Sequence, residues 1–437
     1  MTSNSERHNV LHTWCVQADW NGPTITGGRG ARFWDVSGRE YLDLSSLAEC
    51  MNLGHQHPAL IAAIQEQAAK LCYTSSAWGA EPRAELAGLL LEKSGFEGGR
   101  VFFTLGGADA NEQAVKFARQ VTGRNLIVTR ERSYHGASYG AMALSGDSRT
   151  GAQADPAAFG VLRALPPYAY RCPFGTHSSL ACGAMAAAQV AVMMDQARAP
   201  GVAAVLMEPN AGTNGIVAPD NYWPALRRAT RERSTLLIAD EVMSGFGRCG
   251  EWFAWQRHGE EGRPDLMSLA KGLTGAHIPL GAVVLSREVA AQLEHEMLYT
   301  GLTYSGHPLA CAAGIAAIEA YENEGLITRS RALGVQLYQR LQVLQANHPI
   351  IGDVRGGHGL FAVLEFVKDP ATREPLSPWP QLAPQLRGLV DAAREAGVSF
   401  AARGNLLILA PPLVIGEAEL NNAIDLLDRL LGDLVTA

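Results

Sequence analysis

From about residue 100 onward, short runs of consecutive apolar residues alternate with stretches of helical periodicity. This alternation restricts the fold more than any other feature of the sequence. The runs have the length of buried strands. They are Val101–Thr104, Leu126–Thr129, Val202–Met207, Leu236–Ala239, Leu266–Leu269 and Ala282–Leu285. Continuous apolar strands separated by amphipathic helices are typical of a mostly parallel sheet buried on both faces. The sequence therefore predicts an α/β fold whose central sheet is flanked by helices.

The two ends of the chain differ from this central part. Helical periodicity recurs near residues 326–346 and 417–431, and these stretches bracket short strands such as Leu406–Leu409. With 437 residues, the chain is also too long for one ordinary core. We therefore expect a large domain over residues 71–325, and a small α+β domain that combines residues 1–70 with residues 326–437.

Charge and cysteine content argue against several classes of protein. The formal net charge is −7 and no basic run is interleaved with aromatic residues, so nucleic-acid binding is not expected. The N-terminus lacks the pattern of a secretory signal, and no apolar stretch is long enough to span a membrane. The 7 cysteines are scattered without a CxxC pair, which favours reduced thiols and gives no reason to expect a metal site. We expect a cytoplasmic protein.

Two of the predicted strands end at residues that carry chemistry. The run Leu236–Ala239 is followed directly by Asp240, and the run Leu266–Leu269 is followed closely by Lys271. Because ligands bind at the carboxyl edge of a parallel sheet, an acid and a lysine delivered there can act on one molecule. Taken alone the pair is weak evidence, since most lysines simply face solvent.

A third feature is the sequence Gly106-Gly107-Ala108, which follows a predicted strand and opens a helix. Small residues there allow backbone N–H groups to approach an anion at the helix N-terminus, although a plain tight turn would give the same sequence. Neither a P-loop nor a GxGxxG pattern is present, so a nucleotide is not expected. An anion cradle, an acid and a lysine on one sheet edge together suggest pyridoxal phosphate (PLP).

With these residues in view, the sequence resembles the class III aminotransferases, the family of ω-amino acid and amine transaminases, over nearly its whole length. The resemblance is densest over residues 237–248, Pro264-Asp265 through Lys271-Gly272, and Pro279–Gly281. Supporting matches lie at residues 107–112, 134–136, 208–209 and 303–308. It implies PLP fold type I, with a mostly parallel seven-stranded sheet in the large domain. It also implies a homodimer with active sites at the interface.

The resemblance also implies roles for the residues at the sheet edge. Lys271 would bond to the cofactor aldehyde, give way to the substrate amine, and then carry a proton between substrate and cofactor. We expect burial to lower the pKa of this lysine and so to make its neutral form available. Asp240 would keep the pyridine nitrogen protonated, so that the ring can accept electrons from the substrate.

Further cofactor contacts follow from the same resemblance. Tyr134 would stack on one face of the ring and Val242 would press on the other, although Tyr134 is also compatible with simple core packing. The N–H groups of Gly107 and Ala108 would hold the phosphate, with the Thr303 hydroxyl reaching in from a partner subunit. His135 and the strand-end acid Glu208 complete the expected surroundings of the cofactor.

The sequence departs from the family pattern at two of these places. Many relatives have Ser where Ala108 stands, so one hydroxyl contact to the phosphate is missing. Many also have Gln where Met243 stands, and that residue bonds the phenolic oxygen of the ring. Neither difference removes the essential chemistry.

Substrate preference is suggested by two missing charges. Relatives that use 2-oxoglutarate typically have a Glu and an Arg at the places that here look like Thr213 and Ile408. Without a fixed cation for a second carboxylate, the site should favour pyruvate. In pyruvate-dependent relatives an arginine swings in to pair with the substrate carboxylate, and Arg403 matches it because its fork suits bidentate binding. An exposed loop residue is the alternative interpretation of Arg403.

Two more residues are candidates for substrate binding. Glu49 stands where amine transaminases often have a bulky aromatic residue, and a carboxylate there would recognise a second positive group on the donor. A surface acid after a small misalignment is the alternative interpretation of Glu49. Trp78 is expected to line the same pocket.

We therefore expect a PLP-dependent aminotransferase that moves an amino group from an ω-amino acid or primary amine, such as β-alanine or taurine, to pyruvate. One alternative is a 2-oxoglutarate-dependent transaminase of the 4-aminobutyrate or ornithine type. Another is a PLP lyase, aminomutase or decarboxylase, since those enzymes share Lys271 and Asp240.

Overall fold

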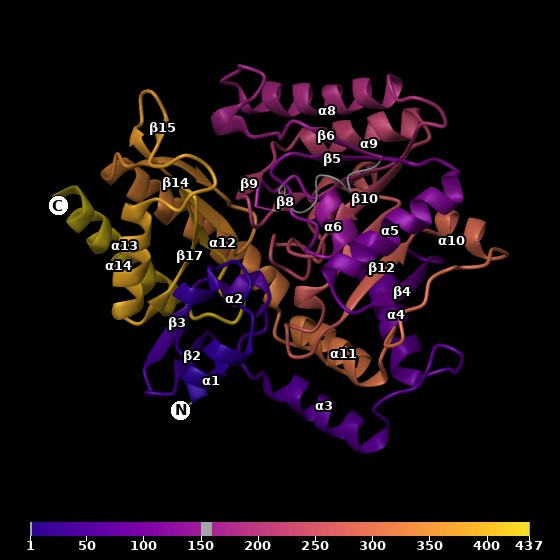
Figure 1. Ribbon diagram of the computed structural model, residues 1–437, viewed down its shortest axis with the longest axis horizontal. Helices are drawn as coiled ribbons and strands as arrows, with labels where there is room; N and C mark the ends of the chain where they lie inside the picture. Colours follow the sequence, from indigo (N-terminus) through magenta and orange to yellow (C-terminus); the bar gives the residue numbers. More distant parts are fainter. Residues whose placement is uncertain (1, 150–159, 437) are drawn as a thin grey trace.

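The large sheet occupies the centre of the molecule in the computed structural model, which describes residues 2–149 and 160–436 (Figure 1). Within these residues, the sheet has seven strands in the order β4-β12-β11-β10-β7-β5-β6. Their bounds in that order are Arg100–Thr104, Gly281–Leu285, Leu266–Leu269, Leu236–Asp240, Val202–Met207, Leu126–Arg130 and Val161–Ala164. Strand β12 is antiparallel to both of its neighbours, and the remaining strands run parallel to one another.

The predicted mostly parallel sheet is therefore confirmed, and each of the six apolar runs forms a strand of it. Strand β6 was not among those runs. It lies at the edge of the sheet, and three of its four residues are only partly buried. An edge strand does not need apolar residues on both faces, so the pattern that identifies the inner strands does not mark it.

Alternate residues of the strands pack into two separate cores, one on each face of the sheet. On one face, Ile238 packs in a cluster with Ala114 and Phe117 of α5 (Gly107–Thr122). On the other, Leu237 belongs to the main core with residues of α9 (Tyr222–Glu232). Because successive side chains of a strand point to opposite faces, both faces need a helical cover. Helix α5 covers one face. Helices α8 (Ser179–Asp195) and α9, which lie together in Figure 1, pack into the core on the other face.

The two ends of the chain meet beside the large sheet. Strand β16 (Val398–Ser399) pairs parallel with β3 (Glu40–Asp43). Strand β3 pairs in turn with β2 (Arg32–Asp35), and β2 pairs with β1 (Ile25–Arg29). A second small sheet contains β13 (Ile351–Arg355), β14 (Ala362–Asp369), β15 (Glu374–Pro375), β17 (Ala401–Arg403) and β18 (Leu406–Leu409). This contact is expected if residues 1–70 and 326–437 form one domain, and the boundaries at residues 70 and 325 stay a prediction.

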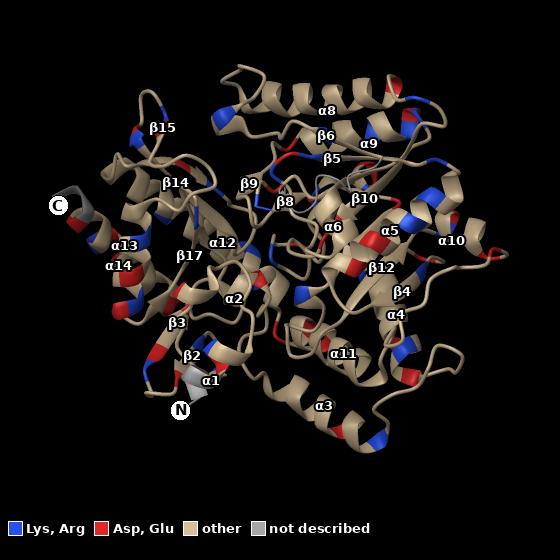
Figure 2. Ribbon diagram, viewed as in Figure 1, with Lys and Arg blue, Asp and Glu red and all other residues tan. Residues whose placement is uncertain are grey.

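The remaining helices cover these sheets or connect them. They are α1 (Thr2–Asn9), α2 (Ser46–Glu49), α3 (Pro58–Lys70), α4 (Glu81–Ser94), α6 (Tyr139–Leu144), α10 (Arg287–Leu293), α11 (Pro308–Asn323), α12 (Leu326–Asn347), α13 (Pro384–Glu395) and α14 (Glu417–Thr436). A short ribbon joins β8 (Asn210–Ala211) to β9 (Ile216–Val217). Acidic and basic residues are interspersed on α5, whereas those on α14 are mostly acidic (Figure 2). Among the described residues, no helix has both the length and the apolar character needed to cross a membrane.

Strand β12 lies against the turn that leads from β4 into α5, and a glycine makes this approach possible. A Cβ atom at Gly281 would lie 2.4 Å from the Gly106 carbonyl oxygen and 2.4 Å from Thr104 Oγ1. These distances are too short for any contact, and the Gly106 carbonyl belongs to the backbone and cannot move freely. Gly281 therefore fixes the position of the N-terminus of α5.

We expect Gly281→Ala to lower the free energy of unfolding by about 1–3 kcal/mol, because the added methyl group forces the β4–α5 turn away from β12. Gly88→Ala is the matched control, since Gly88 lies in helix α4 with open space around it. That change should raise the stability by up to about 1 kcal/mol through helix propensity. Urea unfolding followed by circular dichroism measures both. Equal effects of the two substitutions would mean that the approach at Gly281 is not constrained.

Candidate active site

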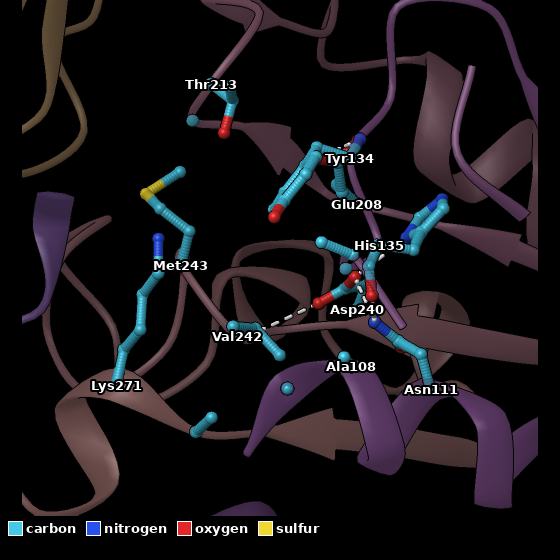
Figure 3. Close-up of a pocket in the computed structure, with 15 residues that line it drawn as sticks. Ala108, Asn111, Tyr134, His135, Glu208, Thr213, Asp240, Val242, Met243 and Lys271 are labelled. Atoms are coloured by element: carbon cyan, nitrogen blue, oxygen red, sulfur yellow. Dashed lines mark hydrogen bonds and ion pairs between the residues drawn. The ribbon is translucent and has the colours of Figure 1, made fainter. Parts of the chain in front are cut away.

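A pocket opens at the carboxyl ends of the parallel strands, as Figure 3 shows. Its lining comes from segments that follow β4, β5, β7, β10 and β11 in turn. The residues are Gly107, Ala108, Asn111, Tyr134, His135, Gly136, Ala137, Glu208, Gly212, Thr213, Asp240, Val242, Met243, Ala270 and Lys271. The structure therefore brings together eight of the predicted site residues: Gly107, Ala108, Tyr134, His135, Glu208, Asp240, Val242 and Lys271.

Asp240 is a buried carboxylate with its orientation fixed from several sides. Oδ2 accepts a hydrogen bond from Asn111 Nδ2 at 2.8 Å and lies 2.7 Å from His135 Nδ1. Oδ1 accepts from the Val242 N–H at 3.0 Å. A buried carboxylate requires such donors, because removing it from water without them is costly. The same side chain, only 3% exposed, is thereby aimed into the pocket.

The start of α5 lies beside Asp240 and Val242 in the pocket wall. Its N-cap residue is Gly106, which has no side chain to accept hydrogen bonds from the first-turn N–H groups. Those donors are left for a ligand, and the helix dipole favours an anionic one. A Cβ atom at Gly107 would lie 2.9 Å from both γ-carbons of Val242, so glycine is needed for this approach. The arrangement suits a phosphate group.

Tyr134 and Val242 lie on opposite sides of the pocket in Figure 3. The Tyr134 ring also has an edge contact with Trp14. Glu208 lies behind Tyr134, where it accepts weakly from the Tyr134 N–H at 3.4 Å and pairs with the buried Arg130 at 2.9 Å. Burial raises the pKa of Glu208 even with that arginine beside it. A flat ring between Tyr134 and Val242 would therefore have apolar contacts on both faces.

Lys271 lies just after β11, with a backbone φ of +46° that is uncommon for a residue with a Cβ. Its Nζ donates to Glu49 Oε2 at 2.9 Å. Burial by itself lowers the pKa of Lys271, but the charge of Glu49 and this hydrogen bond outweigh it and raise the pKa above its usual value. The expected lowering of this pKa is therefore wrong for the free lysine, because a buried carboxylate faces the amine.

A family model described as aminotransferase class-III matches residues 16–431 of this chain. The chain belongs to the class III aminotransferases. It is 35% identical to a leucine/methionine racemase of Thermococcus litoralis, over 93% of this chain and 90% of that protein. It is 32% identical to a putrescine–pyruvate aminotransferase of Pseudomonas aeruginosa, over 94% and 91% of the two chains. A solved taurine:2-oxoglutarate aminotransferase from Bifidobacterium kashiwanohense, in complex with PLP and glutamate, matches with a TM-score of 0.94 at 35% identity, covering 99% of this chain and 97% of that one.

These matches confirm the predicted family, PLP fold type I and dependence on PLP. The pocket fits the cofactor on its own evidence as well. An uncapped helix start faces one part of it, and the buried atoms Asn111 Oδ1 and His135 Nε2 have no hydrogen-bond partner in the described residues. When bound, PLP supplies an aldehyde for the amine and a ring that accepts electrons from the substrate.

The residues of a class III aminotransferase then have separable tasks here. With PLP bound, Lys271 would hold the reactive amine and would take up and return a proton at the substrate carbon. Asp240, fixed by Asn111 and His135, would present its carboxylate to the ring nitrogen. Gly107 and Ala108 would offer backbone N–H groups to the phosphate, while Tyr134 and Val242 would restrict the ring. These individual roles stay predictions that the placement of the residues supports.

The four remaining predicted residues lie outside this pocket lining. Arg403 is in β17, with its side chain 10% exposed, and Glu49 is 8% exposed, so both alternatives that placed them on the surface are wrong. Trp78 is 72% exposed, and its carbonyl accepts from Arg83. The Thr303 carbonyl accepts from the Tyr73 hydroxyl at 3.0 Å. Trp78 and Thr303 therefore do not reach the pocket of their own chain.

Asn111 was not assigned a role from the sequence, although it lies in the motif of residues 107–112. Its amide joins Asp240 Oδ2 to the His135 carbonyl, at 2.8 and 2.9 Å. Its spacing in the sequence could have indicated a role. Residue 111 lies one helical turn after Gly107 and so faces the same side of α5. Asp147, which pairs with Arg403, carried no comparable signal.

We expect covalent capture of PLP by the cofactor-free protein to speed up with rising pH, because Lys271 must lose its proton before it attacks the aldehyde. Glu49→Gln should lower the pKa of Lys271 and so make capture faster at neutral pH, by about tenfold for each unit of pKa while the pH lies below both pKa values. Stopped-flow absorbance measures the rate, normalised to the reaction of PLP with Nα-acetyl-lysine amide.

Glu92→Gln is the control, since that exposed carboxylate pairs with Lys93 rather than Lys271. It should leave the rate unchanged. A Glu49→Gln protein with the wild-type rate and pH dependence would show that Glu49 does not hold Lys271 protonated.

Proposed function

We propose that this protein transfers an amino group from an ω-amino acid or a primary amine, such as β-alanine or taurine, to pyruvate. The observation that carries the proposal is the position of Arg403 beside the pocket. Its Nη1 donates to the carbonyl of Thr213 at 3.0 Å, and Thr213 lines the pocket. One guanidinium therefore lies within reach of a substrate carboxylate.

One nitrogen of the Arg403 guanidinium already pairs with a carboxylate of the protein. Its Nη2 lies 2.7 and 2.8 Å from the two oxygens of Asp147. Burial lowers the pKa of Arg403 to about 10, with Asp147 opposing the shift. The guanidinium thus stays charged at neutral pH. Exchange of Asp147 for the carboxylate of pyruvate would replace one ion pair of Arg403 with another.

Among the described residues that line the pocket, Lys271 is the only lysine or arginine, so the lining itself offers no other fixed cation for a second acid group. Thr213 is neutral, and Ile408 packs with Met243 in a buried apolar cluster. These residues support a monocarboxylate acceptor. The similar proteins differ on this point, since one is named for pyruvate and another for 2-oxoglutarate, so acceptor preference needs a direct measurement.

A homodimer belongs to the same proposal. Apolar side chains are exposed on two neighbouring segments, at Tyr73 and Trp78 and at Met297, Tyr299 and Tyr304. Tyr73 contacts the ring of Tyr304 and bonds the carbonyl of Thr303, so the segments form one surface. A second copy packed there would cover it and bring Thr303 and Trp78 to a neighbouring pocket. The cytoplasmic location stays a prediction.

With a primary amine as donor, we expect kcat/KM for pyruvate to exceed that for 2-oxoglutarate by at least about tenfold. Arg403→Met should raise the KM for pyruvate about tenfold or more with a smaller change in kcat, because the lost contact is made by bound substrate. Arg394→Met, which removes an exposed arginine of α13, is the control.

Chromatographic analysis of the products measures kcat/KM for each acceptor and the KM for pyruvate. Preference for 2-oxoglutarate would establish the alternative acceptor. A product formed from the amine without any keto acid would indicate a lyase or a related reaction instead.

A further inference from the structure

The segment that delivers Glu49 has an unusual backbone. Ser46, Leu47, Ala48 and Glu49 have consecutive φ values of +48°, +41°, +78° and +57°. These are left-handed values, which residues with a Cβ rarely adopt singly and almost never in succession. Such strain persists only where surrounding contacts impose it, and it concentrates at functional sites.

Buried contacts hold this segment in place. The Ser46 hydroxyl donates to the Ala410 carbonyl at 2.6 Å and accepts from Arg248 Nη2 at 3.0 Å. Arg248 is fully buried, and its Nη2 also donates to Asn52 Oδ1 at 2.8 Å. On the other side, Asp43 Oδ1 accepts from the Ser45 N–H and hydroxyl. The turn is therefore a fixed feature of the fold.

The result of this turn is a buried carboxylate directed at the pocket. Glu49 Oε2 lies 2.9 Å from Lys271 Nζ, and a Cβ atom at Gly212 would lie 3.3 Å from the same oxygen. Gly212, Met243 and Lys271 all line the pocket. In Figure 3, Lys271 and Met243 lie on the side of the pocket away from Asp240. The site therefore has a carboxylate near each end.

The two carboxylates differ in what surrounds them. Asp240 has Asn111, His135 and a backbone N–H, none of which the reaction removes. Glu49 faces the amine of Lys271, and that amine is the group that must turn to the cofactor aldehyde. While that amine is bonded to the aldehyde, before a substrate displaces it, the buried Glu49 carboxylate would face the substrate space without this partner, and it requires another cation.

The substrate nitrogen that bonds to the cofactor cannot supply the positive charge that Glu49 requires, because it must lose its proton to form that bond. A second cationic nitrogen on the same molecule keeps its proton throughout. Gly212 and Met243 beside Glu49 are uncharged, so the Glu49 carboxylate is the charge that a distal group of the donor would meet there. The carboxylate or sulfonate of an ω-amino acid would be repelled there.

We propose that Glu49 is a specificity-determining residue that binds a second ammonium group of the amine donor, so that diamines and diamino acids are preferred over monoamines and over β-alanine or taurine. This inference rests on the proposed function, because it narrows the donor class of that transfer. Arg403 and Glu49 then have different tasks, since one receives the acid group of the acceptor and the other the distal cation of the donor.

The first experiment measures binding without turnover. N,N,N′,N′-tetramethyl-1,4-diaminobutane carries two positive charges, but as a tertiary amine it cannot bond to the aldehyde. Calorimetry with the PLP-loaded protein should show that it binds at least about tenfold more tightly than N,N-dimethylbutylamine. Glu49→Gln should abolish this difference, whereas Glu92→Gln should keep it. Equal affinities in the wild-type protein, or a preference that survives in Glu49→Gln, would overturn the proposal.

The second experiment measures turnover with 1,4-diaminobutane and with 1-aminobutane, each with pyruvate as acceptor. Glu49→Gln should lower kcat/KM for the diamine at least about tenfold relative to that for the monoamine. A ratio unchanged by the substitution contradicts the role of Glu49. If neither these amines nor β-alanine and taurine react with pyruvate, the proposed function fails, and the calorimetric comparison still decides the role of Glu49 independently.

Discussion

The buried carboxylate of Asp240 is the charge on which the rest of this site depends. Strand β10 ends at Asp240, and Asn111, His135 and the Val242 N–H fix its two oxygens. Each of these partners comes from a segment that also lines the pocket. The start of α5 is thereby held next to the end of β5 and the turn after β10. Satisfying one buried charge consequently assembles most of the surface that a PLP ring and phosphate require.

The topology of the sheet explains why this assembly was predictable from the sequence. Parallel strands place their carboxyl ends at one edge, so Gly107, Glu208, Asp240 and Lys271 had to come together once their strands were recognised. The inner strands were recognisable because both of their faces are buried, as with Leu237 and Ile238. The search for continuous apolar runs missed strand β6, because it lies at an edge of the sheet and contains Arg163.

Contacts between distant segments could not be predicted in the same way. Glu49 and Lys271 are 222 residues apart, and their contact depends on a left-handed turn that no propensity favours. Asp147 and Arg403 are 256 residues apart, and nothing near either one marks the other as its partner. The pKa of Lys271 shows the consequence. Burial was foreseeable from the sequence, but the carboxylate that reverses its effect became evident only in the structure.

The assignment of Lys271 as the residue that holds the cofactor is tested most directly by chemical trapping. Reduction of the PLP-loaded protein with borohydride, followed by digestion and mass spectrometry, locates the bond between cofactor and chain. We expect the added mass on the peptide that contains Lys271, and none in a Lys271→Ala protein. A stable adduct on another lysine, such as Lys93 or Lys116, would contradict the proposed arrangement of the site.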